Sequence, residues 1–189
     1  MKRLFLGSLT LLVIFLSCIP AEPTRQKERF KQEFLDYINQ ARRDGCNCGH
    51  TYMPPAPPLK WNDQLENAAL GHAEDMATKN YFSHTSKDGR SMSDRIVFAG
   101  YVFKGYKSFT VGENIAAGQL SVPEVMTGWL KSEGHCKNLM NPSFKEVGVA
   151  RFKNYWVQDF GGRESFSASE QKLLKSGRYR LVQKKVSGH

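Results

Sequence analysis

Three polar side chains with the chemistry of a metal or reaction centre occur at wide spacing in the middle of the chain. His84 ends the segment YFSH, Glu113 lies in the apolar, glycine-rich segment VGENIAAG, and His135 lies in KSEGHCKN. Two imidazoles and a carboxylate can hold a divalent metal with one open position, or they can act as general acid and base. Their spacing forms no local motif, so each could instead cap a helix or bond to backbone.

Other patterns of catalytic residues are missing from the sequence. It contains no HExxH motif, P-loop, dinucleotide-binding glycine motif or GxSxG nucleophile motif. Cys136 beside His135 could be a thiol nucleophile with its base, but catalytic dyads are normally assembled in space and not from sequence neighbours. His72 lies on the apolar face of an expected helix, and we interpret it as a core histidine.

The candidate residues must be positioned by the helices and strands around them. Apolar residues at helical spacing predict amphipathic helices at residues 28–43, 63–80, 91–101 and 121–132. Asn62 is the expected N-cap of the second helix. Ser91 with Asp94 begins the third helix, and Ser121 with Glu124 forms a capping box for the fourth.

The remaining segments predict strands and an irregular connection. Residues 147–152 and 155–161 have the composition of strands and are joined by a turn at Lys153 and Asn154, which predicts a hairpin. Residues 45–61 contain four prolines and two glycines and predict an irregular surface strap. Helices followed by a terminal hairpin indicate an α+β fold.

Residues 1–17 have the composition of an export signal. Two basic residues precede an apolar run at residues 4–16, which is shorter than the about 20 residues of a membrane-spanning helix and is typical of a signal peptide. Cys18 follows Leu-Ser and resembles the lipidated cysteine of the bacterial lipobox, although Phe15 stands where leucine is usual. An ordinary signal peptide is the alternative. Residues 18–26 are expected to form a tether.

Export permits disulfide bonds among the three remaining cysteines. Cys46 and Cys48 are too close in sequence for an easy mutual bridge, so we expect one of them to pair with Cys136. Three reduced cysteines are an alternative, and so is a zinc site that includes His50. The paired CxxC spacing of structural zinc modules is missing.

The chain is basic, with a formal net charge of +9 at pH 7. Seven Lys or Arg and two Glu occur from Arg163 onward, so residues 163–189 are expected to be a basic extension. Such charge suits anionic partners such as phospholipid headgroups or acidic wall polymers, and solvated surface is the simplest interpretation. No nucleic-acid-binding motif accompanies the charge, so we expect no nucleic-acid partner.

Four segments in this order resemble the CAP superfamily, which comprises cysteine-rich secretory proteins, antigen five and pathogenesis-related proteins. They are HAEDMATKNYFSHTSKDGRSMSDRI, GENIAAG, GWLKSEGHCKNLMNPSFKEVGVA and YWVQDFG. The chain is most similar to the short bacterial, SCP-like extracellular branch, and the likeness covers about residues 30–161. It implies a CAP domain at residues 27–162, folded as a three-layer α-β-α sandwich with a small central antiparallel sheet.

The resemblance also implies which residues form the site. The family's central cleft holds two histidines and two acidic residues, and the motifs place His84, Glu113 and His135 at three of these positions. The second acid of eukaryotic members falls on Ser132, a change that is common in bacterial members, so Ser132 is an accessory residue. Glu133 is adjacent, but one helical residue rotates a side chain by about 100 degrees, so a replacement cannot be assumed.

The same branch has a cysteine followed by a glycine ahead of the proline strap, which implies a Cys48–Cys136 disulfide and a free Cys46. Family members have been linked to lipid and sterol binding, metal binding, proteolysis and signalling, so the family fixes no single activity.

We favour a monomeric, non-enzymatic module of the cell envelope, anchored through Cys18 or else secreted. It is expected to bind a lipid, glycan or wall polymer, together with Zn²⁺ or another divalent cation at His84, Glu113 and His135. The alternative is a hydrolase of peptides or envelope polymers. In it the histidines hold zinc or transfer protons, Glu113 polarises water and Ser132 orients it.

Overall fold

A computed structural model describes residues 22–177 of the chain. Its helices are α1 (Glu22–Asp44), α2 (Asp63–Lys79), α3 (Met92–Phe98), α4 (Val122–Lys131), α5 (Glu133–Met140) and α6 (Ala168–Lys175). Its strands are β1 (Cys46–Cys48), β2 (Thr51–Met53), β3 (Lys60–Trp61), β4 (Ser108–Ala117), β5 (Glu146–Phe152) and β6 (Tyr155–Glu164). The expected signal peptide and Cys18 lie outside these residues. Within residues 22–177 no helix has the length and apolar character needed to cross a membrane.

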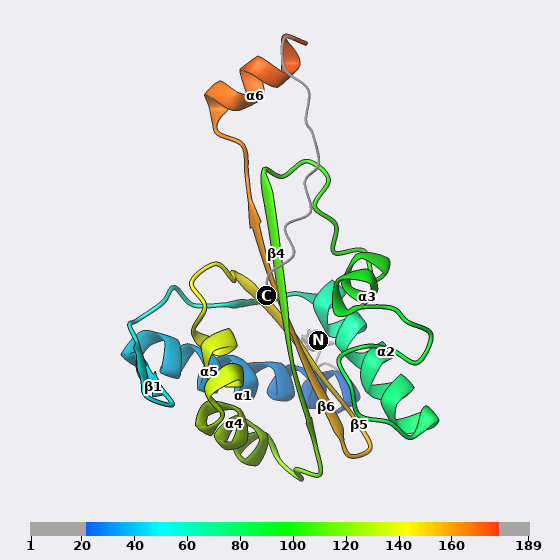
Figure 1. The fold of residues 1–189 in the computed structure, drawn as a ribbon. Coiled ribbons are helices and arrows are strands. Elements are labelled where there is room, and N and C mark those ends of the chain that lie inside the picture. The colour runs from blue at the N-terminus through cyan, green and yellow to red at the C-terminus, as the bar shows by residue number, and fades with distance from the viewer. Residues whose placement is uncertain (1–21, 178–189) are drawn as a thin grey trace, which may run out of the picture.

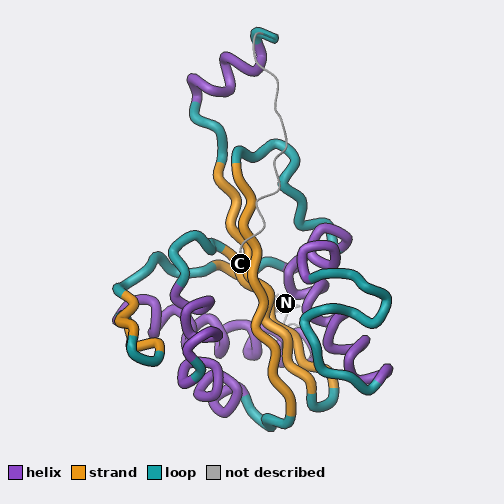
Figure 2. The backbone as a smooth tube through the Cα atoms, viewed as in Figure 1, coloured by secondary structure: helices purple, strands orange, loops and turns teal. Residues whose placement is uncertain are grey.

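Four strands form the central sheet in the order β3-β5-β6-β4, with β3 parallel to β5 and the other pairs antiparallel. Figure 1 shows α2 and α3 on one side of this sheet and α1, α4 and α5 on the other. Figure 2 shows the same layers, with β1 and β2 as a separate small hairpin. The α-β-α sandwich implied by the family resemblance is therefore confirmed.

Alternation along the strands supplies apolar side chains to both helical layers. Val147 and Val149 of β5 join Trp156 and Phe160 of β6 in one buried cluster, which also contains α1, α4 and α5 residues. The opposite face packs against α2 through a second cluster, whose members are Ala69, Ala73, Met76, Ile115, Ala150 and Val157. Helices therefore cover both faces of the central sheet. β4, which carries Glu113, is an edge strand of this sheet.

Two of the three predicted helix caps form as expected, and the third forms in part. The Asn62 side chain accepts hydrogen bonds from two backbone amides of α2, and Ser91 forms a capping box with Asp94. Ser121 accepts from the amide of Glu124 as expected, but the Glu124 carboxylate accepts from the amide of Leu120. The hairpin of β5 and β6 turns at residues 153–154 as predicted.

One expectation about secondary structure was wrong, and two expected domain limits fall inside regular elements. Residues 45–61 are not wholly irregular, because they contain β1 and β2, which pair around a turn with Gly49 at φ 60°, and β3. The tether expected at residues 18–26 overlaps α1, which begins at Glu22 with Pro23 in its first turn, where proline costs no hydrogen bond. β6 continues to Glu164 and so crosses the expected domain boundary at residue 162.

Two elements that carry candidate residues were not predicted. β4 contains the segment VGENIAAG, for which no strand was predicted, and Gly112, Glu113 and Asn114 interrupt its apolar pattern. Long-range pairing stabilises it, since all ten residues of β4 pair with β6, and the ring of Phe144 fills the space beside Gly112. α5 begins directly after α4 and contains His135, which therefore lies within a helix.

A buried arginine fixes the proline-rich strap against the body. The Arg42 guanidinium donates to the carbonyl of Pro57 at 2.6 Å and to that of Leu139 at 2.7 Å. Burial lowers the pKa of Arg42 to about 10. These bonds tie α1, the strap and α5 together, next to the segment that carries His135.

Candidate functional site

Glu113 lies on the face of β4 that is directed toward α2, and its side chain is 1% exposed. Its Oε1 accepts a hydrogen bond from Nδ1 of His84 at 2.7 Å, and its Oε2 accepts one from Nη2 of Arg95 at 2.7 Å. Both carboxylate oxygens therefore have partners within the protein. This arrangement makes Glu113 an orienting group for His84.

His84 lies in the loop between α2 and α3, with a side chain that is 56% exposed. Because a carboxylate can only accept, Nδ1 of His84 carries a proton that it donates to Glu113. Nε2 is then the ring nitrogen that remains for a metal, a proton or a ligand. The backbone carbonyl of His84 is itself held by Arg95 at 3.0 Å.

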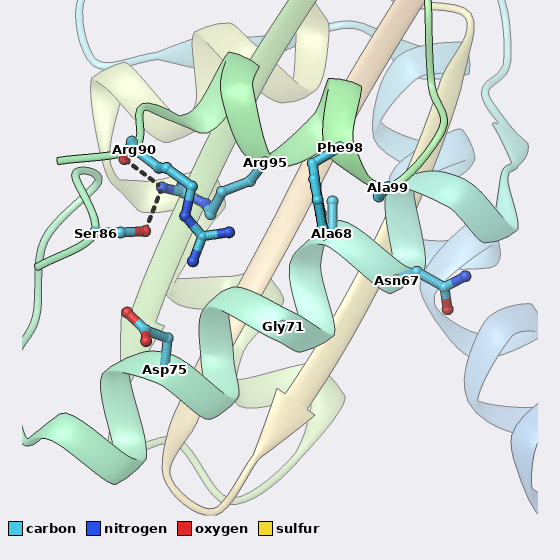
Figure 3. Close-up of a pocket in the computed structure, with 9 residues that line it drawn as sticks. All are labelled: Asn67, Ala68, Gly71, Asp75, Ser86, Arg90, Arg95, Phe98 and Ala99. Atoms are coloured by element: carbon cyan, nitrogen blue, oxygen red, sulfur yellow. Dashed lines mark hydrogen bonds between the residues drawn. The ribbon is translucent and has the colours of Figure 1, made fainter. Parts of the chain in front are cut away.

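Arg95 is a central residue of the site that the sequence interpretation missed. Its Nη1 donates to the carbonyl of His84. The same nitrogen donates to Oγ of Ser86 and to the carbonyl of Arg90 (Figure 3). Its side chain is 5% exposed. The residue was visible in the motif SMSDRI, but an arginine in a short helix usually indicates surface charge.

Asp159 is a second acid that was also missed. It lies directly opposite Glu113 in the pairing of β4 with β6 and is fully buried. Burial, and then the negative charge of Glu113, raise the pKa of Asp159 well above its usual range, which favours the neutral acid. Successive side chains of the segment YWVQDFG alternate between the two covered faces of the sheet. This alternation was the sequence signal that could have identified Asp159 as a buried acid.

His135 approaches the site from the other side of the sheet, on α5. Its backbone carbonyl accepts from Nδ2 of Asn114 at 3.2 Å, and Nδ2 of Asn138 donates to the carbonyl of Glu113 at 3.2 Å. Asn114 also bonds to Gln158 of β6. Burial, and then the charge of His84, lower the pKa of His135, which favours its neutral ring.

The site is therefore built around the edge strand β4. Glu113 points to the α2 side of this strand, while its neighbour Asn114 points to the α5 side, as strand alternation requires. His84 lies in the loop between α2 and α3, and His135 lies on α5. Figure 1 shows these helices on opposite sides of the sheet. No single segment of the chain could show this convergence.

Ser132 and Glu133 differ in what they can offer the site. Ser132 joins α4 to α5 and makes no side-chain capping bond to α5. Glu133 is exposed and forms an ion pair with Lys137 one turn later at 2.5 Å. Glu133 therefore does not take the place of the missing acid.

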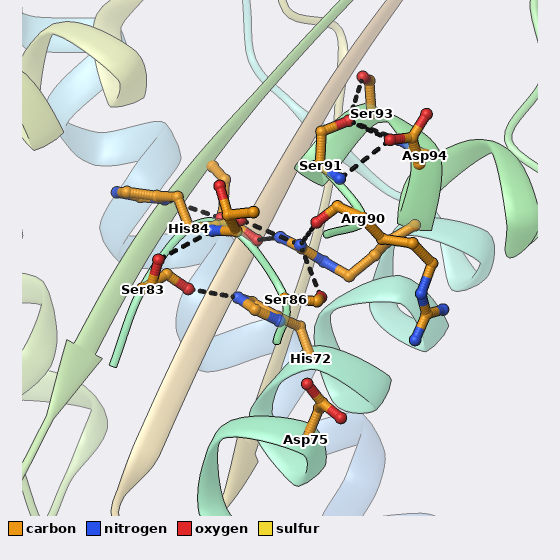
Figure 4. Close-up of polar contacts among 12 residues, drawn as sticks. His72, Asp75, Ser83, His84, Ser86, Arg90, Ser91, Ser93 and Asp94 are labelled. Atoms are coloured by element: carbon orange, nitrogen blue, oxygen red, sulfur yellow. Dashed lines mark hydrogen bonds and ion pairs between the residues drawn. The ribbon is translucent and has the colours of Figure 1, made fainter. Parts of the chain in front are cut away.

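His72 supports the loop that carries His84. It is fully buried, and its Nε2 lies 2.9 Å from the carbonyl of Ser83, the residue before His84 (Figure 4). Burial lowers the pKa of His72. The interpretation of His72 as a core histidine is confirmed.

A cavity of about 330 Å³ adjoins the site between α2 and α3. Arg95 and Ser86 belong to both the cavity wall and the polar cluster around Glu113 (Figure 3). Ala68, Phe98 and Ala99 supply apolar wall. An apolar group could therefore be accommodated beside the polar site.

The cysteines have the pairing that the family resemblance implies. Cys48 and Cys136 form a disulfide with a Cα–Cα distance of 5.3 Å, and Cys46 is free. In the described part of the chain, these three are the one group of three or more possible metal ligands whose donor atoms all lie within 4.8 Å of one another. A metal at His84 and His135 would therefore rely on the two imidazoles and on ligands from outside the chain.

Comparison with known proteins gives a consistent result. The family model described as "CAP: Cysteine-rich secretory protein family" matches residues 35–160. From Bacillus subtilis (strain 168), "Uncharacterized membrane protein YlbC" is 40% identical over 103 residues, which cover 54% of this chain and 28% of that protein. "Uncharacterized protein YkwD" from the same organism is 39% identical over 108 residues, 56% of this chain and 40% of that protein.

A solved structure supports the same assignment. The crystal structure of an extracellular protein containing a SCP domain from Bacillus anthracis is 32% identical, with a TM-score of 0.58, and the match covers 75% of this chain and 44% of that one. The chain spans less than half the length of each of these three relatives. It belongs to the CAP family of cysteine-rich secretory proteins and has extracellular bacterial relatives.

Proposed function

We propose that the protein is an exported CAP-domain module that binds an envelope ligand at the site of His84, Glu113 and His135. Zn²⁺ or another divalent cation is held there by the two imidazoles, where it supplies Lewis acidity toward oxygen atoms of the ligand. The observation that carries this proposal is the bond from His84 Nδ1 to buried Glu113, which leaves Nε2 free. Metal-binding histidines commonly have such a carboxylate partner.

The proposed ligand is a lipid, glycan or wall polymer of the bacterial envelope. Extracellular relatives support this class, and the partly apolar cavity beside Arg95 can receive a hydrophobic group. We further propose that Cys18 carries a lipid anchor, which keeps the module at the membrane surface. If the protein binds no member of a panel of lipids and wall fragments, this ligand class is wrong.

Calorimetric titration with Zn²⁺ tests the metal site. Wild type is expected to bind one ion, and His84→Ala and His135→Ala are each expected to abolish this binding. Glu113→Gln should weaken it by roughly 10–100-fold, the usual cost of losing an outer-shell partner. Exposed His50 provides the matched control, and His50→Ala should bind as wild type does. Unchanged binding by His135→Ala would contradict the proposal.

A hydrolase is the second candidate function. It is favoured by the Glu113–His84 pair, because a carboxylate that holds Nδ1–H prepares Nε2 to act as a general base. In this case Ser132 helps to orient the attacking water. Turnover of peptides or envelope fragments should then disappear in the His84→Ala/His135→Ala double variant, and activity that survives this change excludes the mechanism.

A further inference from the structure

The free thiol of Cys46 lies against the disulfide. Its Sγ is 3.6 Å from Sγ of Cys136 and 4.0 Å from Sγ of Cys48. Cys48 and Cys136 are fully buried, and Met140, Met53 and Leu130 pack around the sulfurs. Three sulfur atoms therefore share one apolar site where β1 contacts α5.

This grouping follows from the local geometry of β1. Cys46 and Cys48 are two residues apart in a strand, so their side chains leave the same face. That face is directed at Cys136 on α5, to which Cys48 is bonded. The hairpin of β1 and β2 thus presents two sulfurs to the single sulfur of the helix.

The position of Cys46 does not suit attack on the disulfide. An attacking thiolate approaches along the extension of the S–S bond, so its distances to the two sulfurs would differ by about 2 Å, the bond length. The observed distances of 3.6 and 4.0 Å place Cys46 beside the bond instead. Burial also raises the pKa of Cys46, which disfavours its thiolate in the absence of a cation.

The same distances match those between thiolate ligands of one metal ion. A Zn–S bond of about 2.3 Å with tetrahedral angles separates neighbouring sulfurs by about 3.8 Å. Cys46 already has such separations from both other sulfurs. Opening of the disulfide would therefore need only a movement of about 2 Å between Cys48 and Cys136 to complete a three-sulfur set.

We propose that Cys46, Cys48 and Cys136 form a redox-gated site for a thiophilic d¹⁰ cation such as Zn²⁺. A dithiol reductant opens the site: its two sulfurs take up the disulfide bond, and Cys48 and Cys136 become thiols. Binding of the cation then displaces the three thiol protons. Without reductant the disulfide persists, as is usual outside the cytoplasm. This site is distinct from the histidine site and independent of the proposed function.

The probe for this site is Cd²⁺, whose thiolate complexes absorb in the ultraviolet by charge transfer. The full chain with Cys18→Ser is reduced with a phosphine, freed of the reductant and titrated anaerobically. In the reduced protein the thiolate band is expected to grow until one Cd²⁺ per chain has been added. The oxidised protein is expected to show no such band. The His84→Ala/His135→Ala variant should retain the band, which separates this site from the histidine site.

Cys46→Ser is the matched variant, because it keeps the disulfide pair and loses only the third sulfur. Its reduced form should bind Cd²⁺ at least roughly tenfold more weakly, since loss of a ligand costs no less than loss of an outer-shell partner. Equal binding by the reduced Cys46→Ser variant and the reduced parent overturns the proposal, as does a reduced parent without the band. If circular dichroism shows that reduction unfolds the chain, Cd²⁺ must refold the parent and not Cys46→Ser; otherwise the proposal is wrong.

Discussion

Glu113 and Asp159 face each other across β4 and β6, both are buried, and Glu113 accepts a hydrogen bond from the exposed ring of His84. Two acids in one dry site repel each other when both are charged. Arg95 supplies the compensating charge through its 2.7 Å bond to Glu113, and it also lowers the pKa of Asp159 against the effect of burial. The orientation of His84 therefore depends on a buried arginine that lies 18 residues from Glu113 in the sequence.

Arg95→Met is expected to destabilise the fold strongly. Removal of the guanidinium leaves Glu113 as an uncompensated buried charge, which costs about 3–5 kcal/mol of the free energy of unfolding. Chemical denaturation measures this loss, and Arg95→Met/Glu113→Gln should recover part of it. Arg90→Met is the control, because Arg90 is exposed and pairs only locally with Asp88. Similar losses for Arg95→Met and Arg90→Met would show that the buried charge is not the cause.

Gly148→Ala is expected to disrupt the packing of α2 on the sheet. A Cβ atom at Gly148 would lie 2.0 Å from the backbone nitrogen of Glu66, and backbone cannot yield as a flexible side chain can. Overpacking of this kind costs typically about 1–3 kcal/mol or more. At Gly71, a residue of α2, a Cβ would meet nothing within 4 Å. Gly71→Ala should therefore raise the free energy of unfolding by roughly 0.5–1 kcal/mol. Thermal melts that rank the two variants the other way would contradict this packing.

Cys136→Ser is expected to cost stability through the loss of the disulfide. The bridge closes a separation of 88 residues, which the chain-entropy model values at about 4–5 kcal/mol. Cys46→Ser leaves the bridge intact and should change the unfolding free energy of the oxidised protein little. Urea denaturation without reductant compares the two. An equal loss in both variants would mean that Cys46, and not Cys48, carries the structural bond.

Glu146→Gln is expected to alter the pH dependence of stability. Burial raises the pKa of Glu146, but donors from Tyr101 and Asn62 and the charge of Arg163 outweigh burial and leave this pKa below its usual value. The carboxylate therefore stabilises the fold at pH values above about 4.3, the pKa of a glutamate in the unfolded chain. This contribution is lost as the pH falls through the lower pKa that Glu146 has in the folded protein. At pH 7 the substitution should cost roughly 1–3 kcal/mol.

The difference between Glu146→Gln and wild type should be smaller at about pH 3 than at pH 7, because the wild-type carboxyl takes up a proton as the pH falls through its folded pKa. Urea denaturation at both pH values gives the measurement. Glu133→Gln is the control, since Glu133 is exposed and pairs only with Lys137. A Glu146→Gln deficit that is constant with pH would show that the carboxylate charge is not what stabilises the fold.

Local features of the structure could be predicted well. The caps at Asn62 and Ser91 and the turn at Lys153 depend on neighbours within a few residues, and all three are confirmed. The likeness of four ordered motifs predicted the sandwich and the Cys48–Cys136 bond correctly. These motifs also named His84, Glu113 and His135, whose role as a binding site stays a prediction.

The missed features that matter most for the site depend on contacts between distant segments. β4 is stable only through its pairing with β6, so its interrupted apolar pattern gave no strand signal. Arg95 and Asp159 resemble ordinary charged residues until their burial is known.

The sequence by itself determined four of the helices, the caps at Asn62 and Ser91, the hairpin and the membership of the family, because these depend on short-range geometry and on motif order. Only the tertiary structure decided that Glu113 orients His84 instead of standing free, that Arg95 and Asp159 join it, and that Cys46 lies beside the disulfide. The physical reason is that burial and the partners of a charge or a thiol are set by strand register and layer packing. Those in turn depend on the whole chain.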